Sequence, residues 1–203
     1  MATNTTTDRT STDALDWNHQ LVDQLELHWQ SQLRPRLQGL TDDEYTWEPV
    51  PGCWNLRPRH ESTAQIAAGS GDLVLDFQMP EPEPAPVTTI AWRIGHLIVG
   101  VFGARVAGHF DGPPVDYMSY EWPTTASGAL EALDQAHDAW TDGVRSLGND
   151  GLSNEIGPSE GEWARHSFAT LILHINREVI HHGAEICLLR DLYRDSHGDA
   201  LGT

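Results

Sequence analysis

The sequence predicts an all-α fold, an up-and-down bundle of four helices with a long irregular insertion between the first and second helices. Three observations lead to this prediction. Four segments carry apolar residues at helical spacing. The links between these segments are rich in glycine and proline, and no internal repeat is present. At 203 residues, the chain is long enough for one such domain with a sizeable core.

The chain divides into one domain with two short ends. Residues 1–12 are polar and rich in Ser and Thr, without the apolar run of a signal peptide, so we expect a disordered leader. Residues 13–195 form the single helical domain, and residues 196–203 are expected to form a flexible tail.

The first helix is expected from about Ala14 to Leu37, where Trp and Leu residues recur at near-helical spacing. Pro35 is expected to kink this helix or end it early, because proline cannot donate a helical hydrogen bond. Thr41 then precedes a short helical turn. Glu44, three residues later, completes the pattern of a capping box.

The stretch between the first and second helices is expected to be irregular. Residues 47–57 contain two prolines and a glycine, and should form a loop held down by two tryptophans. Residues 60–86 are the least helical part of the chain. Within them, the apolar run 73–77 forms either a short strand or the lining of a loop, and residues 80–84 alternate Pro with Glu, as in an extended surface connector. We interpret 60–86 as an insertion within one domain.

Three further helices complete the predicted bundle. They are expected over about residues 88–107, 127–147 and 167–193, each with apolar residues on one face. The first of the three contains glycines that each lower helix propensity by up to ~1 kcal/mol relative to Ala. Small residues at these positions suggest close packing, and together with eight tryptophans they would allow a homodimer.

The charge balance excludes two classes of partner. Twelve Lys+Arg against 30 Asp+Glu give a net charge of −18, which argues against nucleic acid and against an anionic membrane surface. No apolar run approaches the roughly 18 residues needed to cross a bilayer. The acidity is equally well explained as a property of the host organism. Cys53 and Cys187 are expected to be free thiols rather than a disulfide, and we therefore expect a cytoplasmic protein.

The last helix carries the most informative side chains. At about 100° per residue from His174, His182 lies near 80°, inside the apolar stripe, whereas Glu178 lies near 40° on its edge and His181 near −20° outside it. Glu178 and His182 are four residues apart and project from one face. An acid and an imidazole facing the core are costly unless they are paired or ligated. Two alternatives remain open: the pair bonds only to each other, or the helix is rotated and both side chains are solvated.

A third donor comes from the second helix. His96 stands among apolar residues, where a lone histidine is usually a satisfied core residue. In helical bundles, however, facing helices build metal sites from inward carboxylates and histidines. His96, Glu178 and His182 would supply two nitrogens and one carboxylate and leave open metal positions. This set suits catalytic Zn²⁺ first, with Ni²⁺, Mn²⁺ and Fe²⁺ as alternatives.

Three stretches resemble the DinB-like superfamily of four-helix bundle metalloproteins, which includes mycothiol-dependent maleylpyruvate isomerases. They are Leu37–Glu44 with Trp47–Pro49, Ile90–Leu97, and Arg177–Ile186 with Leu188–Tyr193. The resemblance implies one divalent metal, held by a second-helix histidine and two last-helix residues four apart, which map to His96, Glu178 and His182. Of the two ligands on the last helix, the first is a glutamate in the maleylpyruvate isomerase branch of the family, and Glu178 matches this variant. The insertion, longer and more acidic than in a typical member, departs from the family pattern and would cover or reshape the mouth of the site.

The resemblance also implies a function. The leading hypothesis is a metal-dependent transferase, isomerase or hydrolase that acts on a small molecule with a low-molecular-weight thiol such as mycothiol or bacillithiol, the metal activating the thiol or a water. His174, His181 and Glu185 are candidates for proton transfer or for supporting the ligands, although their spacing also fits surface polar groups. Arg93 and Arg177 could bind a carboxylate of the cofactor. The default alternative is a structural role, in which the stem of each arginine packs on the protein and its charged end reaches water.

Two other functional classes stay open. One is a non-catalytic bundle that binds a metal or a small ligand, and the other is a structural protein that has lost its metal. The intact set of three ligands argues against the second of these, but it does not separate an enzyme from a binding protein.

Overall fold

The computed structural model describes residues 15–198, so the expected leader and the end of the expected tail lie outside the described residues. The described chain is mostly helical and carries one small antiparallel sheet. Its helices are α1 (Trp17–His28), α2 (Arg34–Arg36), α3 (Asp42–Tyr45), α4 (Ile90–His96), α5 (Ala104–His109), α6 (Ala126–Gly151) and α7 (Phe168–Ser196). Its strands are β1 (Leu56–Pro58), β2 (Ile66–Ala68) and β3 (Leu73–Phe77).

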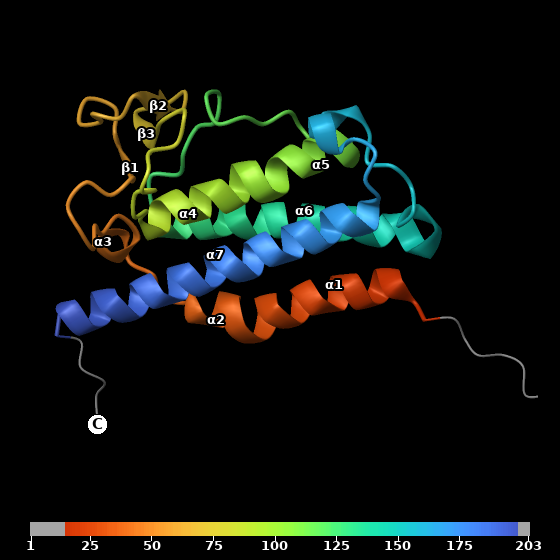
Figure 1. The fold of residues 1–203 in the computed structure, drawn as a ribbon. Coiled ribbons are helices and arrows are strands. Elements are labelled where there is room, and N and C mark those ends of the chain that lie inside the picture. The colour runs from red at the N-terminus through yellow and green to blue at the C-terminus, as the bar shows by residue number, and fades with distance from the viewer. Residues whose placement is uncertain (1–14, 199–203) are drawn as a thin grey trace, which may run out of the picture.

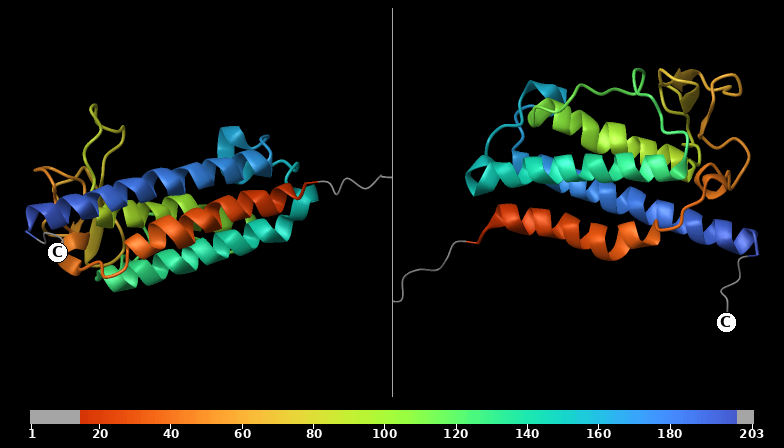
Figure 2. Two further views of the ribbon diagram at one scale, coloured as in Figure 1. Left: turned by 90° about the horizontal axis from the view of Figure 1, so that it is seen from below. Right: turned by 180° about the vertical axis from the view of Figure 1, so that it is seen from behind.

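Two π-helical stretches join short helices into long ones. Trp29–Leu33 connects α1 to α2, and Leu97–Gly103 connects α4 to α5. With α6 and α7 these give four long helical segments that run alongside one another (Figures 1 and 2). The segments α1 and α4–α5 each pack against both α6 and α7. All four of the predicted helices are therefore present, with ends a few residues from those expected.

Polar side chains cap the last three long segments. Thr89, Thr125 and Ser167 each accept a hydrogen bond from the backbone N–H three residues later, at the starts of α4, α6 and α7. Each cap satisfies one of the N–H groups that the first helical turn leaves without a partner. The three helices start within about two residues of the positions expected from periodicity.

The first helix continues past the point where proline was expected to stop it. The chain stays helical to Arg36, and the helix before Pro35 widens into the π-helical stretch, in which the N–H of Arg34 bonds to the carbonyl of Trp29. Such a turn accommodates the missing proline N–H without ending the helix. Of the two outcomes expected at Pro35, a kink or an early end, the early end does not occur; the regular α-helix is instead interrupted by the π-helical stretch.

The chain is mostly helical, as predicted, but it is not all-α. A small sheet is formed by β1, just before residues 60–86, and by β2 and β3 within them. Strand β3 lies between β1 and β2 and is antiparallel to both, with Leu75 opposite Leu56 on one side and Ala68 on the other. Strands of three to five residues are too short to show an alternating pattern in the sequence. The sequence left open whether residues 73–77 form a strand or line a loop. Because they pair with β1 and β2, they form a strand.

Hydrogen bonds attach this sheet to the start of α4. The indole Nε1 of Trp92 donates to the carbonyl of Asp76 at 2.9 Å, and the buried Asp76 carboxylate accepts from Arg57 at 2.6 Å. On the other edge, Trp122 Nε1 donates to the carbonyl of Ala68 at 2.7 Å. The insertion is thereby anchored next to the helix that carries His96.

A buried ion pair fixes α3 to α7. Thr41 caps α3 as expected, since its hydroxyl accepts from the N–H of Glu44 at 3.2 Å. The Glu44 carboxylate does not complete the capping box. Instead it accepts from Arg190 on α7, at 2.6 Å to Nε and 2.9 Å to the terminal nitrogen, with both side chains almost fully buried.

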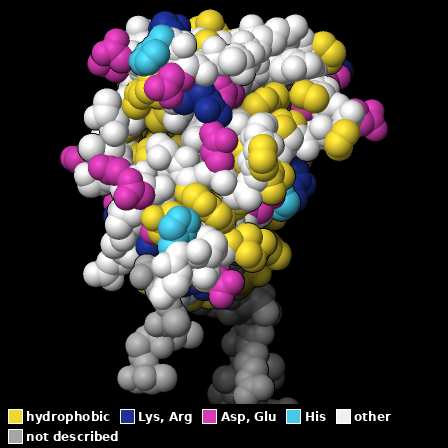
Figure 3. All heavy atoms as spheres, turned by 90° about the vertical axis from the view of Figure 1, so that its left-hand side faces the viewer, with side chains coloured by type: hydrophobic (Ala, Val, Ile, Leu, Met, Phe, Trp, Pro, Cys, Tyr) yellow, Lys and Arg dark blue, Asp and Glu magenta, His cyan; other side chains and the backbone are white. Residues whose placement is uncertain are grey.

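One helical segment, Ile90–His109, is long and apolar enough by length and composition to cross a membrane, contrary to the expectation that no run would approach this limit. Most of it is buried inside the protein, and a core helix passes the same test. On the end of the molecule shown in Figure 3, acidic side chains are scattered rather than gathered into one patch. Cys53 and Cys187 are free thiols, as expected.

Candidate metal centre

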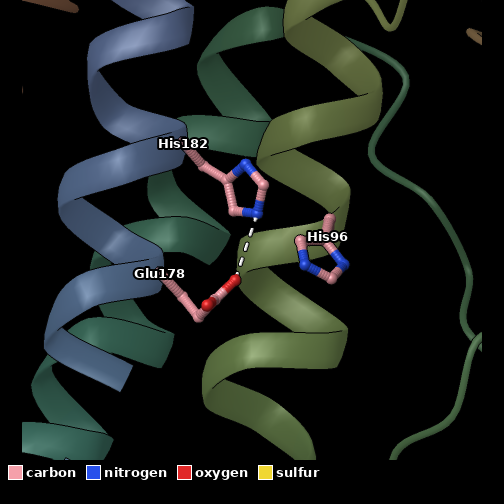
Figure 4. Close-up of side chains that lie close together, drawn as sticks. All are labelled: His96, Glu178 and His182. Carbon is pink, nitrogen blue, oxygen red and sulfur yellow. Dashed lines mark ion pairs between the residues drawn. The ribbon is translucent and has the colours of Figure 1, made fainter. Parts of the chain in front are cut away.

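Three candidate ligands converge between α4 and α7. His96 ends α4, while Glu178 and His182 extend from α7 toward it (Figure 4). Their nitrogen and carboxylate donor atoms all lie within 4.8 Å of one another. The two imidazole rings are 4.9 Å apart between centroids and nearly perpendicular. Residues separated by more than eighty positions in sequence thus share one small volume.

The sequence left two alternatives for Glu178 and His182: the pair bonds only to each other, or the helix is rotated and both side chains are solvated. Their burial and their separation test both. The side chain of His182 is 13% exposed and that of Glu178 is partly buried, whereas His181 is 64% exposed. The α7 helix is therefore not rotated so as to solvate the pair. His182 Nε2 and Glu178 Oε2 are 3.5 Å apart, longer than a good hydrogen bond, so the pair does not satisfy itself.

A carboxylate on the far side of His182 orients its ring. His182 Nδ1 lies 2.8 Å from Glu185 Oε2, and the same carboxylate forms an ion pair with Arg93 from α4. With a proton on Nδ1 donated to Glu185, the Nε2 lone pair faces Glu178 and His96. This arrangement is the usual support of a metal-ligating histidine.

Arg93 completes this contact between the helices. Its guanidinium lies 3.0 Å from His182 Nδ1 as well as against Glu185. Burial lowers the pKa of Arg93, and the charge of Glu185 opposes that shift. Arg93 therefore neutralises the carboxylate that holds His182.

His96 is held in the same way by a tyrosine. Its Nδ1 lies 2.7 Å from the hydroxyl of Tyr117, which leaves Nε2 for the site. Burial lowers the pKa of His96 to about 4, helped by the neighbouring His182 and opposed by Glu178. The imidazole is consequently neutral near pH 7, as a metal ligand must be.

The residues present fit a divalent cation. Two imidazoles and one carboxylate form a donor set typical of catalytic zinc, and each histidine has a hydrogen-bond partner on its second nitrogen. A second group, His181, His182 and Glu185, also brings three donor atoms together. It lies on α7 alone and includes the exposed His181. The group that spans two helices is the better candidate.

A cavity of about 660 Å³ opens onto the three ligands. Part of its wall is aromatic, with Trp54, Phe77, Trp92 and Tyr117 packed in a series of ring contacts. The insertion contributes Phe77 and four further residues to the lining: Met79, Glu81, Ala85 and Pro86. The insertion was expected to cover or reshape the mouth of the site, and its residues do form part of the cavity wall.

The remaining predicted residues divide between this cavity and its surroundings. His174, His181 and Arg93 line the cavity, and Glu185 contacts it through His182. Arg177 does not line it. Its side chain is 69% exposed and lies 2.6 Å from His174 Nδ1 and 3.6 Å from Glu178.

The cavity residues that the sequence-based prediction missed include Tyr117 and Arg105. Tyr117 lies in a Gly- and Pro-rich loop without periodicity, so no pattern places it against His96. Arg105 is nine residues after His96, which an ideal α-helix would put about 180° away. The π-helical stretch Leu97–Gly103 changes that phase, and both side chains line the same cavity.

The comparisons with known proteins yield one match. A family model described as the DinB superfamily matches residues 24–186. This span contains His96, Glu178 and His182, and it covers most of the chain. No curated protein and no solved structure gives a significant match.

Proposed function

This chain belongs to the DinB superfamily, and we propose that it binds one divalent metal and acts as a thiol-dependent enzyme on a small molecule. The superfamily is generally metal-binding. The observation that carries the proposal is the convergence of His96, Glu178 and His182 from two helices at the wall of a cavity. The reaction class would be transferase, isomerase or hydrolase, and Zn²⁺ is the leading metal, ahead of Ni²⁺, Mn²⁺ and Fe²⁺.

The arrangement of the helices supports a more specific fold assignment. We propose that the four long segments form the up-and-down four-helix bundle of the family, as one domain over residues 13–195, with 60–86 as an insertion. The packing of α1 and α4–α5 against both α6 and α7 supports this assignment.

The side chains around the ligands would each do one task. A bound divalent metal would supply Lewis acidity and lower the pKa of a thiol or a water. Glu185 and Tyr117 would orient His182 and His96 through their second nitrogens. Arg93 would balance the charge of Glu185 and bind an anionic group of the substrate. His174 and His181, which line the cavity, would transfer protons.

Small-molecule partners are favoured over macromolecules. The volume of the cavity is in the range of ligand pockets, and the net charge of −18 disfavours nucleic acid and anionic membranes. A cytoplasmic location and a homodimer are predictions from the sequence alone.

Thiol binding can be tested with the Co²⁺-substituted protein. We expect mycothiol, bacillithiol or glutathione to add a sulfur-to-metal charge-transfer absorption, followed by thiol-dependent turnover of an electrophile such as monochlorobimane. The metal-free protein is the control for both measurements. If none of the three thiols changes the absorption and no rate exceeds background, the non-catalytic metal-binding bundle replaces the enzyme.

Tyr117→Phe tests how His96 is supported. Loss of the hydroxyl removes the 2.7 Å contact to Nδ1, and metal affinity is expected to fall about 10- to 100-fold. Tyr120→Phe removes the hydroxyl of a nearby tyrosine that makes no contact with His96, and it should leave the affinity unchanged. Competition with a chromophoric chelator measures both constants. Equal affinities in the two variants would mean that Tyr117 does not support the ligand.

A further inference from the structure

The cavity beside the proposed ligands contains a guanidinium that the proposed function does not use. Arg105 lines this cavity, and the other Arg, Asp and Glu residues of the lining are Glu81, Arg93 and Glu178. Arg93 is paired with Glu185, Glu81 is exposed, and Glu178 is a proposed metal ligand. Arg105 is therefore the charged residue of the lining whose task is still open.

Most of the donors of Arg105 are unused. A guanidinium has five N–H donors. One terminal nitrogen donates to the carbonyl of Gly100 at 2.5 Å, and the other lies 3.5 Å from Glu160, which is longer than a good hydrogen bond. The Nε has no hydrogen-bond partner within residues 15–198. The side chain is 25% exposed, so a carboxylate can reach its terminal nitrogens and accept paired hydrogen bonds from them.

Only one residue separates Arg105 from the ring of His96. A Cβ placed on Gly100 would lie 3.0 Å from His96 Nδ1, and closer still to the hydroxyl of Tyr117. The carbonyl of the same Gly100 accepts the hydrogen bond from Arg105. A compact molecule beside His96 can therefore reach the guanidinium as well.

The wall of the cavity next to His96 consists of aromatic rings with small angles between them. Phe77 lies 5.4 Å from Trp54 and 6.1 Å from Tyr117 between ring centroids, at interplanar angles of 30° and 27°. All three side chains are only partly buried. Tyr117 also contacts His96 at 2.7 Å, which brings this wall to the proposed metal ligand. Such rings offer a planar ligand the offset stacking that aromatic groups prefer.

We propose that the substrate of this site is a compact aromatic carboxylate. Its ring would stack on the wall of Trp54, Phe77 and Tyr117, and its acid group would bind Arg105. The cavity of about 660 Å³ has room for a bicyclic molecule. The word substrate rests on the proposed function, whereas binding of the acid requires neither a metal nor catalysis.

Three ligands with one carbon skeleton separate the two contacts. They are 2-naphthoate, the neutral alcohol naphthalene-2-methanol, and the saturated acid decahydro-2-naphthoate, each titrated calorimetrically into the zinc-supplemented protein. 2-Naphthoate is expected to bind about tenfold more tightly than the alcohol, through charge-assisted hydrogen bonds. It is expected to bind about fivefold more tightly than the saturated acid, through stacking. Absence of either preference would overturn the proposal.

Two variants assign each preference to its residue, and each is the control for the other. Arg105→Gln should remove the preference for the acid over the alcohol and keep the preference for the aromatic ring, and Phe77→Leu should do the reverse. Arg165→Gln deletes the same charge at a side chain that is 89% exposed and outside the cavity lining, and it should change neither preference. If Arg105→Gln or Phe77→Leu lowers all three affinities by one factor, or if Arg165→Gln acts like Arg105→Gln, the proposal is overturned.

Repeating the titrations without added metal separates this inference from the proposed function. The preference for the acid is expected to be smaller, because Glu178 then lacks its cation, but it should still be lost in Arg105→Gln. An acid preference that appears only with zinc and survives in Arg105→Gln would place the carboxylate on the metal and overturn the role of Arg105. If zinc does not bind, the proposed function fails, and the comparison of the variants still tests the aromatic acid.

Discussion

His182→Ala is expected to abolish metal binding. The wild-type protein should hold about one divalent metal per chain, whereas the variant loses one of three ligands on a rigid helix. Residues that merely support a ligand are worth about 10- to 100-fold in affinity, so removal of the ligand itself should cost more than about 100-fold. Elemental analysis after dialysis against a weak chelator measures the difference directly.

His181→Ala is the matched control for this variant. It deletes the adjacent imidazole on the same helix, but that side chain is exposed and pairs with Glu185, which is not one of the three proposed ligands. The metal content should equal that of the wild type. Loss of metal in both variants would transfer the site to the exposed group on α7, which contains both histidines. Circular dichroism of both variants should match the wild type.

Glu44→Ala is expected to destabilise the protein by about 3–5 kcal/mol, the largest stability effect that we predict for a single substitution. The variant leaves the guanidinium of Arg190 buried without its carboxylate, since Glu44 and Arg190 are only 4% and 3% exposed. The two backbone carbonyls that Arg190 also contacts, Arg36 and Gln38, cannot supply the missing charge. Urea denaturation measures the change in the free energy of unfolding.

A surface pair between the same regions provides the comparison. Arg36→Gln removes the contact with Asp191, in which both side chains are about half exposed, and should cost less than about 1 kcal/mol. Replacing Glu44 and Arg190 together with methionine should recover much of the loss, because no unpaired charge remains buried. A Glu44→Ala loss no larger than that of Arg36→Gln would show that this pair does not anchor α3 to α7.

Helical periodicity carries most of what the sequence predicts correctly. The four long segments and the burial of His182 relative to His181 both follow from the 3.6-residue repeat of a helix, which is a local property. The pairing of Glu178 with an inward histidine of another helix follows as well, because the fold class places facing helices together. Their role as metal ligands stays a prediction.

The features that the sequence does not predict depend on contacts distant along the chain or on departures from regular helix. The strand character of 73–77 depends on partners in β1 and β2. Tyr117 reaches His96 from a loop, and Arg105 reaches the same cavity because a π-helical stretch changes the helix phase. Glu44 matches a local capping motif, yet its carboxylate pairs with Arg190, 146 residues away. In that case a tertiary ion pair replaces the local hydrogen bond.

The central claim is that His96, Glu178 and His182 together bind one divalent metal. A crystal structure of the zinc-soaked protein, with anomalous data collected at the zinc edge, tests it most directly. We expect a single strong anomalous peak bonded to both imidazoles and to the Glu178 carboxylate, with Glu185 on the opposite nitrogen of His182. Absence of a peak there, or a peak on the side of His181 and Glu185 instead, would contradict the claim.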